Sequence, residues 1–245
     1  MPTPSAAKRG AVPWLRNRIA QATERAAEKM DSDPESALRS AQATLDWSIR
    51  HRGADSTMTL KAKVEVAERL ERLGRYEEAV QLRRELLTHF RLLVGPGDPS
   101  TLTAEGFQAL DLVRLRRPQE ALPLYQHVLA GRADALGPEH EQTLLAMEWL
   151  GCTLRSLGNL PQSRHLLQQA VDRYEQKGAG ESEECMKATS HLATTLLEMG
   201  QVPESCELRR HILDVRSRTL GPDDPTTLSS LETLANTLRR LELED

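Results

Sequence analysis

Residues 94–102 read VGPGDPSTL, and two later stretches follow the same pattern, LGPEHEQTL at 136–144 and LGPDDPTTL at 220–228. Their starting points differ by 42 residues and by twice 42 residues. In each stretch a glycine and a proline favour the end of one helix. An aspartate before a proline, as in Asp98-Pro99, favours the start of the next helix, because its side chain caps the first turn. The three stretches therefore predict junctions between helices at a fixed spacing.

The 42-residue interval extends through most of the chain, because residues 42 apart agree in character. An apolar column comprises Leu60, Leu102, Leu144, Met186 and Leu228. Two columns of small residues comprise Ala67, Ala109, Gly151, Ala193 and Ala235, and then Ala79, Ala121, Ser163 and Ser205. A turn column comprises Gly74, Arg116, Gly158 and Gly200. A fixed period of this length indicates a chain built from stacked structural repeats.

Each repeat predicts two helices, which we call helix A and helix B. In the first full repeat, apolar residues at helical spacing predict helix A from about Leu60 to Leu73, and Gly74 then ends it. Helix B follows from about Tyr76 to Leu93. The small residues on both helices allow the two axes to approach to about 8–9 Å. One such pair cannot bury its apolar side alone, so the repeats must stack.

The pattern of a small residue, a glycine turn and a second small residue resembles the tetratricopeptide repeat (TPR). The 42-residue period and the LGP-type junctions resemble the kinesin-light-chain-type subclass of that family. The best match is RYEEAVQLRRELLTHF at 75–90, followed by RPQEALPLYQHVLAGR at 117–132. The resemblance covers residues 60–245 and extends more weakly to 18–59. It implies an all-α fold, a right-handed TPR-type α-solenoid of about five helix-turn-helix units.

The same resemblance predicts the domain organisation. We expect a disordered N-terminal tail at 1–12 and a single TPR solenoid at 13–245, opened by a helix in the segment Trp14–Met30. The successive repeats lie at about 13–59, 60–101, 102–143, 144–185 and 186–227, with a capping helix at 228–243.

The family resemblance also predicts where a partner binds. Kinesin-light-chain-type repeats usually carry Asn-Asn-Leu-Ala on helix A, and those asparagines hold a peptide backbone in the concave groove. Here the corresponding stretches lack both asparagines, so either this groove is rebuilt for another ligand or it is not the binding surface. The candidate binding residues on the concave face are Lys61, Glu68, Arg72, Phe107, Leu110, Arg114, Leu145, Glu148, Cys152, Arg155, Lys187, Thr194, Asn236 and Arg239.

Two groups of residues in this set have two interpretations each. Phe107 and Trp149 are either binding anchors or packing residues between repeats. Arginines near the helix A–B turns either dock an acidic segment or belong to a rim neutralised by Glu68, Glu71 and Glu120. This basic ridge comprises Arg72, Arg75, Arg114, Arg116, Arg117 and Arg155.

The composition excludes several classes of protein. The 245 residues carry a net charge of −4, which argues against non-specific binding of nucleic acid. No apolar run is long enough to span a membrane. The three cysteines show no disulfide or zinc spacing, and the seven histidines show no HExxH pattern. We therefore expect a cytoplasmic protein that is not an enzyme and needs no cofactor and no metal.

The predicted function is that of a non-catalytic adaptor that binds another protein or a peptide segment in its concave groove. An alternative is a ligand- or peptide-sensing regulator without a DNA-binding domain of its own. We expect no nucleic-acid partner and no membrane partner. Pairing of two copies of the chain remains open, because the end helices of solenoids can associate.

Overall fold

The computed structural model describes residues 33–244, with side chains described as far as Arg240. The predicted tail at 1–12 and the predicted helix within Trp14–Met30 lie outside the described residues. Residues 33–244 form ten α-helices and contain no strand. The helices are α2 (Pro34–Arg52), α3 (Thr57–Arg72), α4 (Tyr76–Leu93), α5 (Pro99–Arg114), α6 (Pro118–Leu136), α7 (Glu141–Ser156), α8 (Leu160–Gln176), α9 (Glu183–Glu198), α10 (Val202–Thr219) and α11 (Pro225–Glu244).

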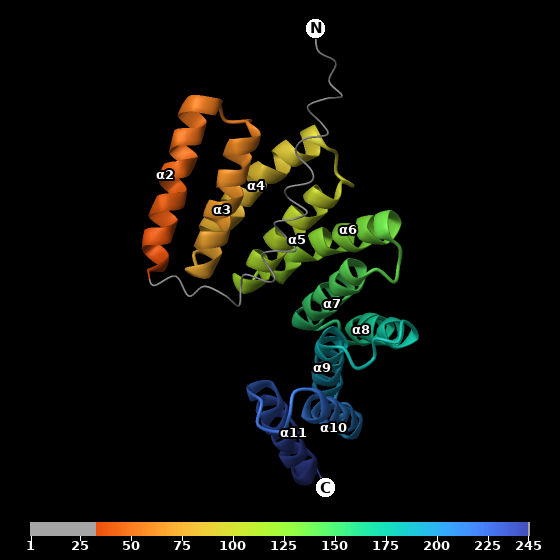
Figure 1. The fold of residues 1–245 in the computed structure, drawn as a ribbon. Helices are drawn as coiled ribbons and strands as arrows, with labels where there is room; N and C mark the ends of the chain where they lie inside the picture. The colour runs from red at the N-terminus through yellow and green to blue at the C-terminus, as the bar shows by residue number, and fades with distance from the viewer. Residues whose placement is uncertain (1–32, 245) are drawn as a thin grey trace. The chain divides into compact units, whose positions relative to one another are not determined.

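The chain divides into two compact units, one ending at Ala135 and one beginning at Leu136. We call them the N-terminal unit and the C-terminal unit. Within the N-terminal unit α2 packs on α3, α3 on α4 and α4 on α5 (Figure 1). Within the C-terminal unit α7 packs on α8, α8 on α9, α9 on α10 and α10 on α11. Within each unit these successive helices therefore lie side by side, as the repeat pattern predicts.

The A helices start at a strictly repeated position. They begin at Thr57, Pro99, Glu141, Glu183 and Pro225, which are 42 residues apart. Each start follows a capping side chain: Ser56 accepts a hydrogen bond from the Thr59 backbone N–H at 3.2 Å, and Asp98 accepts one from the Ser100 N–H at 2.8 Å. The predicted starts at Leu60 and Leu228 are therefore wrong by three residues, because the apolar column marks a position inside the first turn rather than the cap.

The threonine before the apolar column holds the junction together. The hydroxyl groups of Thr59, Thr101 and Thr143 donate to the carbonyl oxygens six residues earlier, at 2.7, 2.8 and 2.8 Å. The acceptors are Gly53, Gly95 and Gly137, whose φ angles are 87°, 96° and 93°. This bond closes the loop between repeats and explains why the dipeptide Thr-Leu recurs in the junctions.

The turn between helix A and helix B requires a left-handed backbone. Gly74, Gly158 and Gly200 have φ angles of 72°, 77° and 78°. Arg116, the exception in this column, adopts the same conformation with φ 60°. A residue with a Cβ atom is strained there, at a cost of roughly 1–2 kcal/mol. The place in the repeat, rather than the residue type, therefore determines the backbone conformation of this turn.

Helix B also begins at a repeated position, at Tyr76, Pro118, Leu160 and Val202. The predicted helix B at Tyr76–Leu93 is confirmed as α4. Pro118 is the first residue of α6, and a proline also lies in the first turn of α8 and of α10. Proline costs little at these places, because the first backbone N–H groups of a helix have no partner within the helix.

The small residues lie where the helices of a pair are closest. Ala67, Ala109 and Ala193 on the A helices are at most 1% exposed, and the facing column on the B helices is fully buried. At Gly151 an added Cβ atom would lie 2.7 Å from Cγ of Leu167. Since real contacts of this kind are longer, Leu167 occupies the space that a side chain at position 151 would need.

Candidate functional site

The A helices carry the candidate residues on a partly exposed side that we call the A-helix face. In the N-terminal unit, Lys61 and Glu68 on α3 and Leu110 on α5 are partly exposed, and Arg72 and Arg114 are exposed. In the C-terminal unit, Leu145, Cys152 and Arg155 on α7 and Thr194 on α9 are partly exposed. Lys187, Asn236 and Arg239 are exposed, and Glu148 is buried.

A buried ionic cluster underlies the A-helix face of the N-terminal unit. Its centre is Arg83 on helix B, whose side chain is only 5% exposed. The Arg83 guanidinium donates to Asp111 on α5 at 2.6 Å and to Glu71 on α3 at 2.7 Å. It also donates to the backbone carbonyl of Phe107 at 2.9 Å. One side chain of helix B thus ties together the A helices of two successive repeats.

The cluster perturbs the two carboxylic acids in opposite directions. Burial raises the pKa of Asp111 to about 7, although Arg83 acts against this shift. Burial also raises the pKa of Glu71, but Arg83 and Arg114 outweigh it, so the pKa of Glu71 lies below its usual value. Glu71 therefore carries the permanent negative charge of the cluster. Asp111 is the residue that changes charge near neutral pH.

Phe107 lies between the ionic cluster and the surface of the A-helix face. Its ring is partly exposed, and the Arg83 guanidinium lies over it at 5.1 Å from the ring centre. A second contact of this kind places the Arg114 guanidinium 5.3 Å from the centre of the Tyr76 ring. Both aromatic rings therefore support arginines that are engaged elsewhere in the cluster. Trp149, the residue 42 positions after Phe107, is also partly exposed.

The structure pairs most of the predicted basic ridge with carboxylates. Arg114 pairs with Glu71, and Arg155 pairs with Glu198 at 2.6 Å. Arg75 and Arg117 pair with glutamates three residues later in the sequence, at 2.6 and 2.5 Å. Of the two interpretations of these arginines, this geometry favours the neutralised rim. The surface is therefore polar and of mixed charge rather than basic.

Consecutive A helices contact each other through residues 43 apart. In the N-terminal unit Glu71 pairs with Arg114, and in the C-terminal unit Arg155 pairs with Glu198. Arg155 occupies the repeat position of Glu71, 84 residues later, so the two pairs have opposite polarity at equivalent places. Glu148 and His191 form a third pair with this offset, at 3.2 Å. The offset fixes which side chains meet on the A-helix face.

A second pair of an acidic and a basic residue also has opposite polarity in two repeats. This pair joins helix A to helix B within each repeat. Lys63 on α3 donates to Glu85 on α4 at 2.9 Å, and 42 residues later Glu105 contacts His127 at 2.5 Å. Glu105 is fully buried and also accepts from Arg91 at 2.6 Å. The exchange of an acidic and a basic residue at the same two positions supports the register that the columns predict.

The residues that organise the face do not stand out in the sequence. Arg83, Asp111 and Glu105 are buried charges that no motif marks. The sequence signal that could have found them is a charged residue that lies, at helical spacing, among apolar residues predicted to be buried. Asp111, for example, lies one residue before the buried Leu112.

Two further searches concern only the described residues. Residues 33–244 contain no group of three or more His, Cys, Asp or Glu side chains placed to hold a metal ion. No helix within the same range has the length and apolar character needed to cross a membrane.

Comparison with known proteins gives the family. The tetratricopeptide repeat model matches residues 58–133, 100–176 and 184–245, which together make up more than half of the chain. The chain belongs to the tetratricopeptide repeat family, a class of repeat proteins that act as protein-interaction modules. No curated protein matches the sequence.

Solved structures with a similar fold agree with this family. One is a single-substitution form of a kinesin light chain from Podosopora anserina that contains nearly identical TPR-like repeats. It is 20% identical, with a TM-score of 0.72 over 90% of this chain and 99% of that one. BtubC (BKLC) from P. vanneervenii is 17% identical, with a TM-score of 0.70 over 85% of this chain and 84% of that one. MamA from Desulfovibrio magneticus RS-1 is 18% identical, with a TM-score of 0.57 over 87% and 99%. These likenesses are likenesses of fold, and with the family match they confirm the predicted all-α, TPR-type α-solenoid fold.

Proposed function

We propose that this protein is a non-catalytic adaptor that binds a peptide segment or a partner protein along its A-helix face, in the concave groove of the TPR fold. The observation that carries the proposal is the arrangement of exposed side chains on this face over a fixed base of ion pairs. Arg83 and the pairs at the 43-residue offset order the face before any partner arrives. A preordered surface loses little conformational entropy on binding, which favours affinity.

The side chains of the face suggest how a partner is recognised. The asparagines that hold a peptide backbone in related repeats are absent, and Leu110, Leu145 and Cys152 provide apolar surface instead. Lys187 and Asn236 add exposed polar groups. We infer recognition through the partner's side chains, with apolar contacts to these residues and polar contacts beside them within each unit.

The predicted organisation and location belong to the same proposal. We propose one TPR solenoid over 13–245, working in the cytoplasm. The three free cysteines support a reducing compartment, because a disulfide framework is typical of secreted domains.

Charge reversal on the two faces of one repeat tests the proposal. Lys187 is exposed on α9, a helix A, and Arg210 is exposed on α10, the helix B that follows it. Lys187→Asp and Arg210→Asp make the same change of charge. For a partner captured from the native cell, we expect Lys187→Asp to weaken binding about tenfold and Arg210→Asp to leave it unchanged.

A second pair of variants tests the apolar part of the face. Leu110→Asp places a carboxylate on α5, and Gln126→Asp places the same group on the exposed side of α6. The proposal requires a loss of affinity in the first variant only, with circular dichroism showing equal helicity in both. Weaker binding in the helix B variants, with full binding in Lys187→Asp and Leu110→Asp, would assign the partner to the other face.

A further inference from the structure

One side of α11 is open, although the same side of the four A helices before it is covered. Leu228 is 49% exposed and Leu231 is 50% exposed. The residues that precede them by multiples of 42 are at most 8% exposed. They are Leu60, Leu102, Leu144 and Met186 in the column of Leu228, and Lys63, Glu105, Met147 and Thr189 in the column of Leu231. The repeat positions of α11 are thus those of a packed helix, but its two leucines remain half exposed.

The open side is the one that packs on helix B in the other repeats. Lys63 on α3 donates to Glu85 on α4, and Leu60 on α3 packs with Leu86 of α4. α11 is the last helix that the structure describes, so no helix B in the described range covers its leucines. In the other repeats a second helix lies on this side, and α11 offers the same positions to one.

Four residues form the apolar line on this side, which we call the α11 stripe. They are Leu228, Leu231, Ala235 and Leu238, at intervals of three, four and three residues. Such intervals are typical of two helices that pack along a narrow seam. Ala235 belongs to the column of small residues that allows helix A and helix B to approach closely in the other repeats. The stripe therefore fits a single helix that lies along α11.

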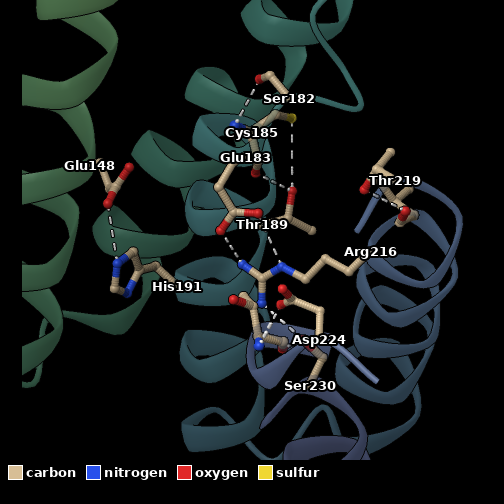
Figure 2. A network of polar contacts seen from close by, with 12 residues as sticks. Glu148, Ser182, Glu183, Cys185, Thr189, His191, Arg216, Thr219, Asp224 and Ser230 are labelled. Carbon is tan, nitrogen blue, oxygen red and sulfur yellow. Dashed lines mark hydrogen bonds and ion pairs between the residues drawn. The ribbon is translucent and has the colours of Figure 1, made fainter. Parts of the chain in front are cut away.

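Polar contacts hold α11 with this stripe turned away from α10. The Arg216 guanidinium of α10 donates to Ser230 on α11 at 2.9 Å and to Glu183 on α9 at 2.6 Å (Figure 2). The side chain of Asp224 caps the first turn of α11, where it accepts from a backbone N–H at 2.7 Å. Because Ser230 faces α10 and is buried, the next residue, Leu231, points about 100° away around the helix axis. The orientation of the stripe is thus fixed within the C-terminal unit.

Two charged residues beside the stripe have opposite signs. Glu232 and Arg239 are both exposed and lie seven residues apart on α11. Seven residues span about 10 Å of helix, so these two side chains are too far apart for an ion pair within one copy. Among the described side chains neither has an ion-pair partner, and Arg239 donates only to Asn236, at 3.0 Å.

The stripe and its two charges are complementary to a second copy of themselves. When two α11 helices lie antiparallel about a two-fold axis at Ala235, residues before Ala235 in one copy face residues after it in the other. Leu231 then meets Leu238 of the second copy, and Glu232 lies beside Arg239 of the second copy. The two alanines meet at the axis, where small residues permit a close approach. One arrangement therefore satisfies the apolar residues and both charges.

We propose that the α11 stripe binds the α11 stripe of a second copy, so that the chain forms a symmetric antiparallel dimer. The second copy covers the half-exposed leucines and forms the pair between Glu232 and Arg239 twice, once on each side of the axis. The inference does not depend on the proposed partner-binding function, and no other protein is needed to test it.

Sedimentation equilibrium of the full chain measures the proposed dimer. We expect wild type to reach twice the mass of one chain, with a dissociation constant on the order of 10 µM. Leu231→Asp should weaken the dimer at least about tenfold, because it places a carboxylate in the apolar seam. Leu92→Asp is the matched control: Leu92 on α4 is 79% exposed and lies outside the stripe, so the constant should not change. Circular dichroism checks that both variants keep the helicity of wild type.

An exchange of charges tests the antiparallel register. Glu232→Arg and Arg239→Glu should each weaken the dimer about fivefold, because each places like charges opposite one another. The double variant Glu232→Arg/Arg239→Glu should recover the affinity of wild type, since the two partners have exchanged places. The two residues do not meet within one copy, so this recovery reports a contact between copies.

A disulfide across the axis gives a second measurement. Under mild oxidation Ala235→Cys should form a covalent dimer on a non-reducing gel, whereas wild type and Ser229→Cys, at an exposed residue outside the stripe, should not. A wild-type chain that stays monomeric at about 100 µM would overturn the proposal and leave the open side to a partner of another sequence. A dimer unchanged by Leu231→Asp, or a charge-exchanged double variant without recovery, would overturn it as well.

Discussion

Arg83 in the N-terminal unit and Arg209 in the C-terminal unit occupy the same position of the repeat, 126 residues apart, and are both buried. Arg83 makes ion pairs with Asp111 and Glu71. Arg209 donates instead to the hydroxyl groups of Ser205 and Thr194, both at 3.3 Å. No carboxylate in the described part of the chain forms an ion pair with it.

The difference follows from the partner positions. The residues 126 positions after Asp111 and Glu71 are Thr237 and Leu197, so the carboxylates are absent where Arg209 needs them. Burial accordingly lowers the pKa of Arg209. The same position of the repeat thus holds an arginine with carboxylate partners in one unit and an arginine without them in the other. The repeat sets where the side chain points, and the neighbouring columns decide what its charge contributes.

Removal of the two arginines should give the largest contrast. Arg83→Met leaves Asp111 and Glu71 without their shared cation, and breaking a buried pair in this way costs about 3–5 kcal/mol. Arg209→Met removes a buried charge together with two long hydrogen bonds, so its free energy of unfolding should change by less than about 1 kcal/mol. Denaturant unfolding, with hydrogen exchange to localise the effect, gives both values. Equal losses in the two variants would contradict the contrast.

The pH dependence should also differ between the two units. In the N-terminal unit the pKa of Asp111 is about 7 instead of its ordinary value of 3.8, so the folded state keeps a proton that the unfolded state loses. The free energy of unfolding should therefore fall as the pH rises from about 4 to about 7 and level off above, by about 4 kcal/mol in total.

Asp111→Asn provides the control for this titration. The difference in unfolding free energy between wild type and variant, plotted against pH, isolates the contribution of Asp111. All other titrating groups are shared by the two proteins. We expect the slope to disappear in Asp111→Asn while the C-terminal unit keeps its own pH profile. A wild-type stability that is flat between pH 5 and pH 8 relative to the variant would show that Asp111 is already ionised.

A third position of the same column gives a smaller effect. Leu167 stands where Arg83 and Arg209 stand in other repeats, and it fills the space beside Gly151. Gly151→Ala should lower the melting temperature, with a cost of about 1 kcal/mol, because Leu167 must move. The double variant Gly151→Ala/Leu167→Val should recover part of that loss. A more stable Gly151→Ala protein would mean that the helix pair has room to spare at this crossing.

The smallest expected change concerns the turn of the N-terminal unit. Arg116 adopts a φ of 60° that glycine adopts in the equivalent turns. Arg116→Gly should stabilise this unit by about 1 kcal/mol, and Gly158→Ala should destabilise the equivalent turn of the C-terminal unit by a similar amount. Thermal unfolding of both variants measures this pair of opposite shifts. A loss of stability in Arg116→Gly would show that the contacts of the arginine side chain outweigh the backbone strain.

The repeat columns predicted most of the fold because each column has one local physical cause. The turn at Gly74 needs a left-handed residue, the crossing at Ala109 needs a small one, and both requirements are visible in the sequence. The predicted helix starts were three residues late because an apolar column marks burial, whereas a cap such as Ser56 is a polar, partly exposed residue.

The candidate face was harder to predict because its contacts join different repeats. Glu71 meets Arg114, and Glu148 meets His191, at an offset of 43 rather than 42 residues, so no column shows the pairing. The buried cluster around Arg83 depends on which repeat supplies a carboxylate. Composition shows how many charges the chain has, but it does not show which of them are buried together.

Site-specific photocrosslinking can show which face of the repeats contacts a bound partner. A photoreactive residue at Leu110 or Lys187 places the probe on an A helix, and one at Gln126 or Arg210 places it on the helix B of the same repeat. We predict that the partner crosslinks from the A-helix positions and not from the helix B positions. Crosslinks from the helix B positions alone would show that the partner binds the other face.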